Sequence, residues 1–207
     1  MNSKKLLIVM LVLSVLFLGL QGCRSSSSNV AETPQEPSKP QEPPKTKQLY
    51  PRNNVHTQTQ GGKTYRANYE NWINPGTGHV IFPVNTVVEI DYGRSGFYII
   101  EKKTNKKIDY EYNDRGMGGM SMEEYVNKIL TSTEPVSLRN LSDIDRKGIT
   151  DGKVYAGMSK DGVRIALGYP AVNRTPSLKS NTWVYAKNRW TSTAITFDDK
   201  GKVKGIK

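Results

Sequence analysis

The sequence offers few side chains that could carry out acid–base, nucleophilic or metal chemistry. Its two histidines, His56 and His79, occur in a linker-like stretch and next to Gly78, and neither has a second ligand at a metal-binding spacing. A Ser-His-Asp triad stays open as an alternative, although the chain contains no G-x-S-x-G nucleophile motif. We therefore expect a protein that is not an enzyme and that has no catalytic residue, metal site or cofactor.

Asp143 and Asp145 are placed like the first ligands of a calcium-binding loop. Such a loop takes an oxygen ligand from its fifth position and a bidentate glutamate from its twelfth. Here the fifth position is Lys147 and the twelfth is Val154, so neither can serve. The segment favours a capped turn ahead of the last domain instead of a calcium site.

Cys23 is the one nucleophile with a clear chemical context, and it is the only cysteine in the chain. It follows a basic start at Lys4 and Lys5 and an apolar run over residues 6–18, which is shorter than the ~20 residues of a transmembrane helix. The four residues that end at Cys23 resemble a bacterial lipobox. We expect signal peptidase to cleave between Gly22 and Cys23, and Cys23 to be lipidated. A plain membrane anchor with an incidental cysteine is the alternative.

The residues after Cys23 predict where the protein resides and how it is tethered. In the sorting rule of enteric bacteria, aspartate after the lipidated cysteine retains a lipoprotein at the inner membrane, whereas this chain has Arg24. The chain is therefore expected in the outer membrane facing the periplasm, or in the cell membrane if the organism lacks an outer membrane. Serines 25–28 and the prolines between Pro34 and Pro44 predict a disordered spacer over residues 23–47. A proline-motif ligand is the alternative.

The chain is strongly basic, with a formal net charge of +11 that falls to +9 once Lys4 and Lys5 are removed with the signal peptide. Nucleic acid is not an expected partner, because the chain is predicted to be exported and has no recognised binding motif. Anionic lipid or an anionic envelope polymer fits the charge. Ordinary solubility explains it equally well.

Residues 48–140 are rich in tyrosine, valine and isoleucine and alternate like β-strands. Examples are residues 65–69, 88–92, 97–100 and 108–112, which are separated by turns. This spacing predicts a small barrel or rolled sheet. The segment Phe82–Val88 also resembles a strand pair of bacterial SH3-like domains.

One helix is predicted inside this β-rich region. Ser121 is placed as its N-cap, and Glu124 completes a capping box. Its apolar positions form one stripe, which we expect to be buried: Tyr125, Val126, Ile129 and Leu130.

The stretch from Gly157 to Val203 reads as a helix followed by two strands and a hairpin turn. Ser159 is a good N-cap, and Gly168 suits the positive φ that often ends a helix. Trp183 and Tyr185 alternate with smaller residues, as in a half-buried strand, so we place them in the core; a binding role is the alternative. A second strand should bury Phe197.

These residues together resemble the SmpA/OmlA family, the BamE-like lipoproteins of outer-membrane assembly. The resemblance covers residues 141–207 and is carried by Gly157-Met158-Ser159, Val163, Leu167-Gly168, Pro170, Trp183-x-Tyr185, Phe197-Asp198 and Gly201-Lys202-Val203. It implies two helices packed on a three-stranded antiparallel sheet, a topology shared with β-lactamase inhibitory protein. The first helix should be short, near Ser142–Lys147, because Gly148 and Gly152 follow.

The sequence thus predicts an α+β protein with four parts: a lipoprotein signal peptide (1–22), the linker (23–47), an SH3-like β domain (48–140) and a BamE-like domain (141–207). The resemblance implies an accessory role in outer-membrane protein assembly or envelope integrity, through contacts with an envelope protein such as the assembly complex. A cell-envelope binding or inhibitor module, directed at cell-wall polymer or a hydrolase, is the alternative.

Overall fold

The computed structural model of the chain describes residues 48–62 and 64–207. The expected signal peptide, the linker and the lipidation site with Gly22 and Cys23 lie outside these residues and stay predictions. The described residues belong to one compact unit. The described elements in chain order are β1 (Tyr50–Pro51), β2 (Val55–Gln60), β3 (Thr64–Asn68), β4 (His79–Phe82), β5 (Val88–Tyr92), β6 (Gly96–Glu101), β7 (Lys107–Glu111), α1 (Met122–Ile129), β8 (Leu130–Thr131), α2 (Asp143–Asp151), α3 (Lys160–Leu167), β9 (Thr182–Ala186), β10 (Ser192–Phe197) and β11 (Val203–Ile206).

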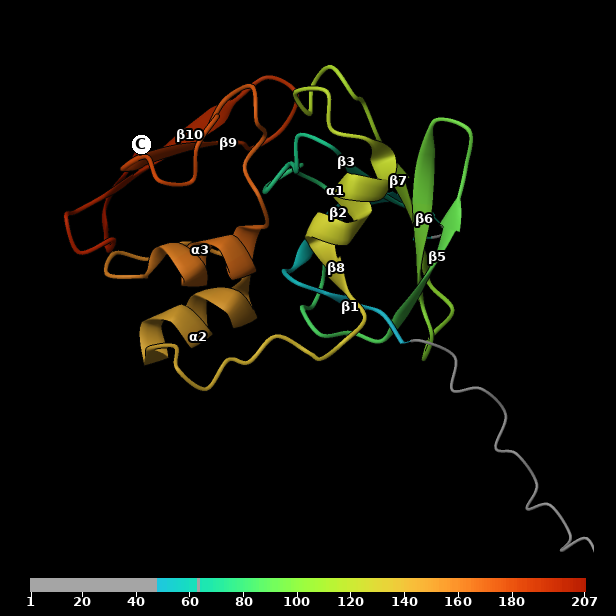
Figure 1. The fold of residues 1–207 in the computed structure, drawn as a ribbon, viewed down its shortest axis with the longest axis horizontal. Coiled ribbons are helices and arrows are strands. Elements are labelled where there is room, and N and C mark those ends of the chain that lie inside the picture. The colour runs from blue at the N-terminus through green and yellow to red at the C-terminus, as the bar shows by residue number, and fades with distance from the viewer. Residues whose placement is uncertain (1–47, 63) are drawn as a thin grey trace, which may run out of the picture. The chain divides into compact units, whose positions relative to one another are not determined.

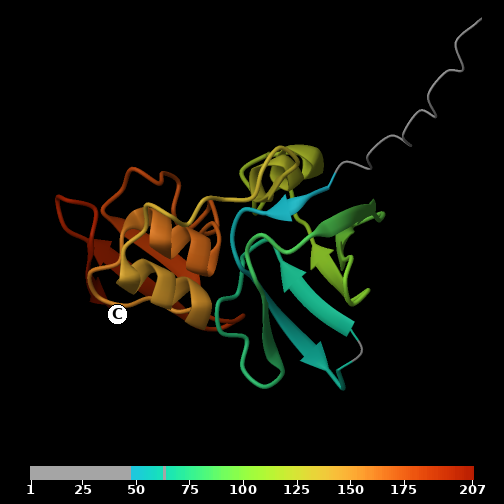
Figure 2. The same cartoon turned by 90° about the horizontal axis from the view of Figure 1, so that it is seen from below.

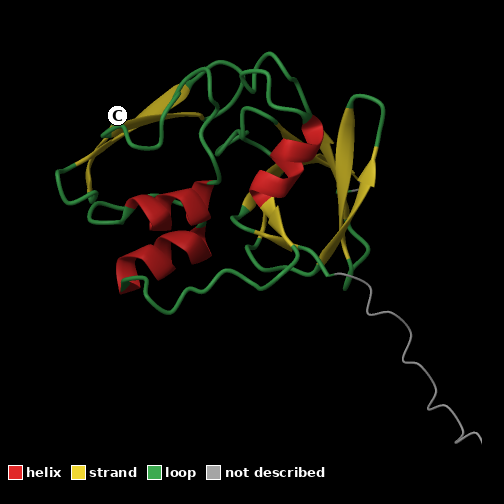
Figure 3. Cartoon of the chain, in the orientation of Figure 1, coloured by secondary structure: helices red, strands yellow, loops and turns green. Residues whose placement is uncertain are grey.

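The chain has the predicted α+β composition, because three helices accompany three separate sheets in the described residues. Figure 3 shows the strands grouped on two sides, with α1 beside one group and with α2 and α3 beside the other. β1 and β8 form a small two-stranded sheet of their own.

The largest sheet contains six strands in the order β4-β2-β3-β7-β6-β5 (Figures 1 and 2). β3 and β7 run parallel, whereas the other neighbours are antiparallel. The two end strands do not pair with each other in the described structure, so the sheet is open and the expected closed barrel is not formed. The strand pair expected around Phe82–Val88 is also wrong, because β4 and β5 lie at opposite ends of the strand order.

Helix α1 covers the first hydrophobic core, as its sequence predicts. The Ser121 hydroxyl accepts from the Glu124 amide at 3.2 Å, and the Ser121 amide donates to the Glu124 carboxylate at 2.7 Å. The stripe at Tyr125, Val126 and Ile129 is buried. The Tyr125 hydroxyl also lies 2.8 Å from that of Tyr110 on β7, so the helix is fixed to the sheet by polar as well as apolar contacts.

The second hydrophobic core lies between α2, α3 and the antiparallel sheet β11-β10-β9. The predicted burial of Trp183, Tyr185 and Phe197 is confirmed, since each exposes 2% or less of its surface. The Trp183 and Phe197 rings meet edge to face, with centroids 4.9 Å apart. The expected hairpin is present too: the Gly201 amide donates to the Asp198 carbonyl, and Gly201 has a φ of 70°.

Helix α2 is longer than predicted, because it continues through Gly148 to Asp151. A Cβ at Gly148 would lie 2.4 Å from the Met158 side chain, so glycine allows a close approach inside the helix and does not end it. Gly152 ends it instead, with a left-handed φ of 59°.

The two cores largely follow the expected division near residue 140, but they share side chains across it. Ile73 and Val84 from the first part pack on the second core, and Tyr169 and Val172 from the second part pack on the first core. The division into two domains therefore stays a prediction, within a single compact unit.

Candidate functional site

Polar groups in β2 and in the residue before it bind the C-terminal end of α3, where helical carbonyls lack partners within the helix. The Asn54 amide donates to the Ile165 carbonyl at 2.8 Å. Its side-chain amide donates to the Ala166 carbonyl at 3.3 Å and to the Ile149 carbonyl at 2.7 Å. His56 contributes a second contact to the Ala166 carbonyl, at 2.9 Å. Asn54 thereby ties both helices of the second core to the first part of the chain.

Gly168 continues this junction beyond the last helical residue. Its φ of 81° agrees with the prediction, and a Cβ there would lie 2.4 Å from the Asn71 side-chain nitrogen. Asn71 donates from that nitrogen to the Leu167 carbonyl, and the Tyr185 hydroxyl donates to the Gly168 carbonyl at 2.9 Å. The chain therefore needs glycine here for close approach as well as for φ.

The two histidines, which sequence reasoning kept apart, meet at this junction. His56 lies on β2, not in a linker as expected, and exposes 2% of its surface. Its Nδ1 lies 3.0 Å from Nε2 of His79 on β4, and the rings are stacked. Since a carbonyl can only accept, His56 must donate from Nε2 to Ala166. Its bare Nδ1 then accepts from His79.

This arrangement requires a neutral His56. Desolvation by burial lowers the pKa of His56 from 6.5 to about 4, and the neighbouring His79 adds to the shift. Burial lowers the pKa of His79 as well. Protonation of both rings would direct two N–H groups at each other, so the pair acts as a neutral structural contact at pH 7.

A mostly apolar pocket of about 520 Å³ opens beside the histidine pair. It lies where β4, the ends of α2 and α3, and the strands β10 and β11 meet. Its aliphatic lining residues are Ile73, Ile81, Val154, Leu167, Ile195 and Ile206. Ile206 exposes 49% of its surface, so part of this lining faces solvent.

The charges around this pocket are mainly positive. Asp151 is neutralised locally, because its carboxylate accepts from Lys147 Nζ at 2.6 Å and from the Tyr155 hydroxyl at 2.7 Å. These hydrogen bonds lower the pKa of Asp151. Lys153 and Lys187 also line the pocket, and neither amino group has an ion-pair or hydrogen-bond partner among the described residues.

A second pocket, of about 330 Å³, has a more polar lining. Gln58, Arg66, Asn68 and Glu111 come from β2, β3 and β7, and Trp72 lies in the loop beyond β3. Planar polar groups next to an aromatic ring can bind a polar, ring-shaped ligand. Sequence reasoning did not find this group, because its members meet only through strand pairing.

The β9–β10 hairpin presents the most exposed aromatic side chain of the described structure. Trp190 exposes 83% of its surface. Asn188 fixes the hairpin tip, since its side-chain oxygen accepts from the amides of Trp190 at 2.9 Å and Thr191 at 3.0 Å. The Arg189 guanidinium lies 5.2 Å from the Trp190 ring centroid. The tip thus presents an exposed aromatic ring next to a cation, on a backbone turn that Asn188 holds in place.

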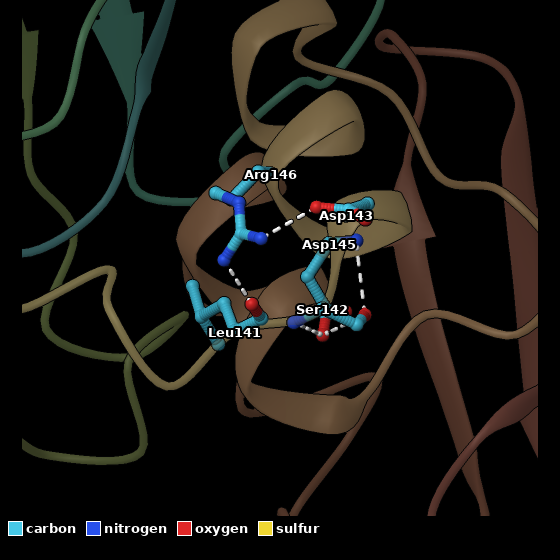
Figure 4. A network of polar contacts seen from close by, with 5 residues as sticks. All are labelled: Leu141, Ser142, Asp143, Asp145 and Arg146. Atoms are coloured by element: carbon cyan, nitrogen blue, oxygen red, sulfur yellow. Dashed lines mark hydrogen bonds and ion pairs between the residues drawn. The ribbon is translucent and has the colours of Figure 1, made fainter.

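The aspartates that resemble a calcium loop have structural tasks in α2 (Figure 4). Asp145 exposes 1% of its surface and accepts from the Ser142 hydroxyl at 2.7 Å and the Ser159 amide at 2.7 Å. Burial alone would raise the pKa of Asp145, but these hydrogen bonds outweigh it and lower the pKa. Asp143 pairs with Arg146 at 2.5 Å. The expected capped turn is therefore the capped start of a helix.

Across residues 48–62 and 64–207, no three or more His, Cys, Asp or Glu side chains are grouped so that they could hold a metal ion. No family model matches the sequence, and no curated protein or solved structure is significantly similar to it. The helices of the described part are also too short or too polar to cross a membrane.

Proposed function

We propose that the chain is a non-enzymatic lipoprotein of the cell envelope, held by acylated Cys23 in the inner leaflet of the outer membrane. The linker over residues 23–47 would carry residues 48–207 away from the bilayer. This folded part would act as an accessory in the assembly of outer-membrane β-barrel proteins, through protein contacts and with anionic lipid as a further partner.

The observation that carries the proposal is the arrangement of α2, α3 and the sheet β11-β10-β9 around one core. The SmpA/OmlA resemblance implies two helices on a three-stranded antiparallel sheet, and we assign the BamE-like architecture to residues 141–207 on that basis. The open six-stranded sheet is the part for which we propose a rolled, SH3-like relationship.

A binding role is supported over catalysis by how the titratable side chains are used. Both ring nitrogens of His56 form hydrogen bonds, one with His79 and one with the Ala166 carbonyl. The Asp145 carboxylate accepts hydrogen bonds from Ser142 and Ser159, the N-caps of α2 and α3. We therefore place an enzymatic function after the assembly role and after the alternative of an envelope binding or inhibitor module.

The proposal predicts that the Trp190 hairpin contacts an assembly subunit, since tryptophan and arginine are enriched at interface hot spots. A photo-crosslinking amino acid placed at position 190 in the chain's host cells should capture a subunit of the β-barrel assembly machinery. Tyr92 is the matched control, because it exposes 54% of its surface and lies on β5 of the other sheet. The same crosslinker at position 92 should not capture that subunit.

The alternative is a module that binds cell-wall polymer or inhibits a hydrolase. The polar pocket beside Trp72 favours the first form, because its side chains could bind the hydroxyl and amide groups of a saccharide. Capture of a hydrolase at position 190, or sedimentation of the protein with purified peptidoglycan, would support this alternative and contradict the assembly role.

A further inference from the structure

We propose that the apolar pocket beside the histidine pair binds a long-chain fatty acid, with the hydrocarbon chain inside and the carboxylate at the lysines. This inference does not depend on the assembly role, although Lys187 lies at the base of the β9–β10 hairpin that carries Trp190. Small-molecule sites are typically apolar concavities of ~300–1,000 Å³ that lie between structural units and carry a few polar groups. The pocket has about 520 Å³ and lies where the two cores meet.

The interior of the pocket suits a hydrocarbon chain. Aliphatic side chains line it beside the polar residues Asn74, His79 and Thr193, and four of the aliphatic ones are only partly covered by the protein: Ile73, Ile81, Val154 and Ile206. A ligand that displaces water from apolar surface in a concave site is bound favourably, because that surface is removed from water. A volume in the lower half of the usual range favours a molecule with one chain over a lipid with two.

The rim of the pocket selects an anionic head group. Lys153 and Lys187 both line it, and neither amino group forms a salt bridge in the described part of the chain. Lys153 is close enough to Asp151 for its charge to help lower the pKa of that carboxyl. Asp151 lies at the same rim, but Lys147 and Tyr155 already engage its carboxylate. A carboxylate bound at either lysine would therefore gain a charge-assisted contact without displacing an existing salt bridge.

The direct test is photolabelling of the full chain in phosphatidylcholine vesicles. The probe is a palmitic acid analogue with a diazirine on its chain and a free carboxylate. Adducts should concentrate on the peptides that carry Ile81 and Ile195, which approach the pocket from different sheets. Unlabelled palmitate should compete with the probe, whereas methyl palmitate, which lacks the charge, should not.

Variants separate the pocket from general partitioning into the vesicle. The double charge reversal Lys153→Glu and Lys187→Glu should abolish labelling of these two peptides, and so should Ile206→Glu at an already exposed position. Lys200→Glu is the control, because Lys200 is an exposed lysine in the turn at the far end of the β10–β11 hairpin. It should label like the wild type, and circular dichroism should show that all variants remain folded.

Three results would overturn the proposal: equal labelling of these peptides in wild type and double variant, competition by methyl palmitate as effective as that by palmitate, or adducts spread evenly along the chain. Competition by lysophosphatidate but not by palmitate would contradict the fatty acid as ligand. None of these outcomes depends on which protein is captured at position 190, so failure here is distinct from failure of the assembly role.

Discussion

Phe197→Ala is expected to lower the free energy of unfolding by about 3–5 kcal/mol, the usual cost of truncating a buried phenylalanine. Phe197 is fully buried and packs edge to face against Trp183. Truncation would therefore remove apolar burial and leave a cavity between α3 and the sheet β11-β10-β9. Denaturant unfolding of wild type and variant measures this difference, which is a large share of the ~5–15 kcal/mol that stabilises a typical domain.

Trp190→Ala is the matched control, because it removes a larger aromatic side chain that is 83% exposed. Its effect on the free energy of unfolding should stay within about 0.5 kcal/mol, as for surface sites in general. A loss below about 1 kcal/mol for Phe197→Ala would mean that this strand does not face the second core.

Acidification should destabilise the protein through His56. The pKa of His56 is lowered from 6.5 to about 4 in the folded state, so the unfolded chain binds more protons between these pH values. The contact in which the bare Nδ1 of the buried neutral ring accepts from His79 is therefore fully available above pH 6.5 and is lost as the pH falls toward 4. The gap between the two pKa values corresponds to about 3 kcal/mol in the free energy of unfolding.

The contribution of His56 is measured as the difference in pH dependence between wild type and His56→Gln. Glutamine can still donate to the Ala166 carbonyl but does not titrate, so the variant should lose less stability between pH 6.5 and pH 4. His79→Gln is the control and should keep most of the wild-type pH dependence, because His79 is less buried than His56. Identical pH profiles for wild type and His56→Gln would contradict the assigned role of the histidine pair.

The parts of the fold that sequence predicted well are those fixed by neighbouring residues. The caps at Ser121 and Ser159 depend on groups within three residues, and the structure has both. The alternation at Trp183 and Tyr185 correctly predicted the buried face of β9, because it too is a pattern among neighbouring residues. The length of α2 was misjudged because Gly148 is required by Met158, a contact that the local pattern does not display.

The junction of the two cores was not predictable in the same way. Strand β2 reads Val-His-Thr-Gln-Thr-Gln, which looks polar, although its β-branched residues at every second position were a usable signal. His56 and His79 meet because β2 pairs with β4, and Asn54 reaches α3 across 112 positions of sequence. The pockets likewise arise from long-range packing. The prediction of a closed barrel was wrong because long-range strand pairing sets the order of the strands, and the spacing of strands along the sequence does not reveal it.

The central claim, an acylated envelope lipoprotein, is tested most directly at its N-terminus, which lies outside the described residues. Cys23 supplies the sulfur that accepts the diacylglycerol, and cleavage after Gly22 then exposes its amino group. One acyl chain anchors only marginally, at about 0.8 kcal/mol per buried methylene, so a stable anchor requires at least two chains.

The measurement is mass spectrometry of the N-terminal peptide from the membrane-bound protein, after labelling of the cells with a palmitate analogue. The account predicts a mature chain that begins at Cys23 and carries lipid there, and a Cys23→Ala variant with neither the label nor that cleavage. Fractionation alone would not decide the matter, because the apolar run over residues 6–18 could hold an uncleaved chain at the membrane. A mature protein that begins at another residue, or a Cys23 without lipid, would contradict the account.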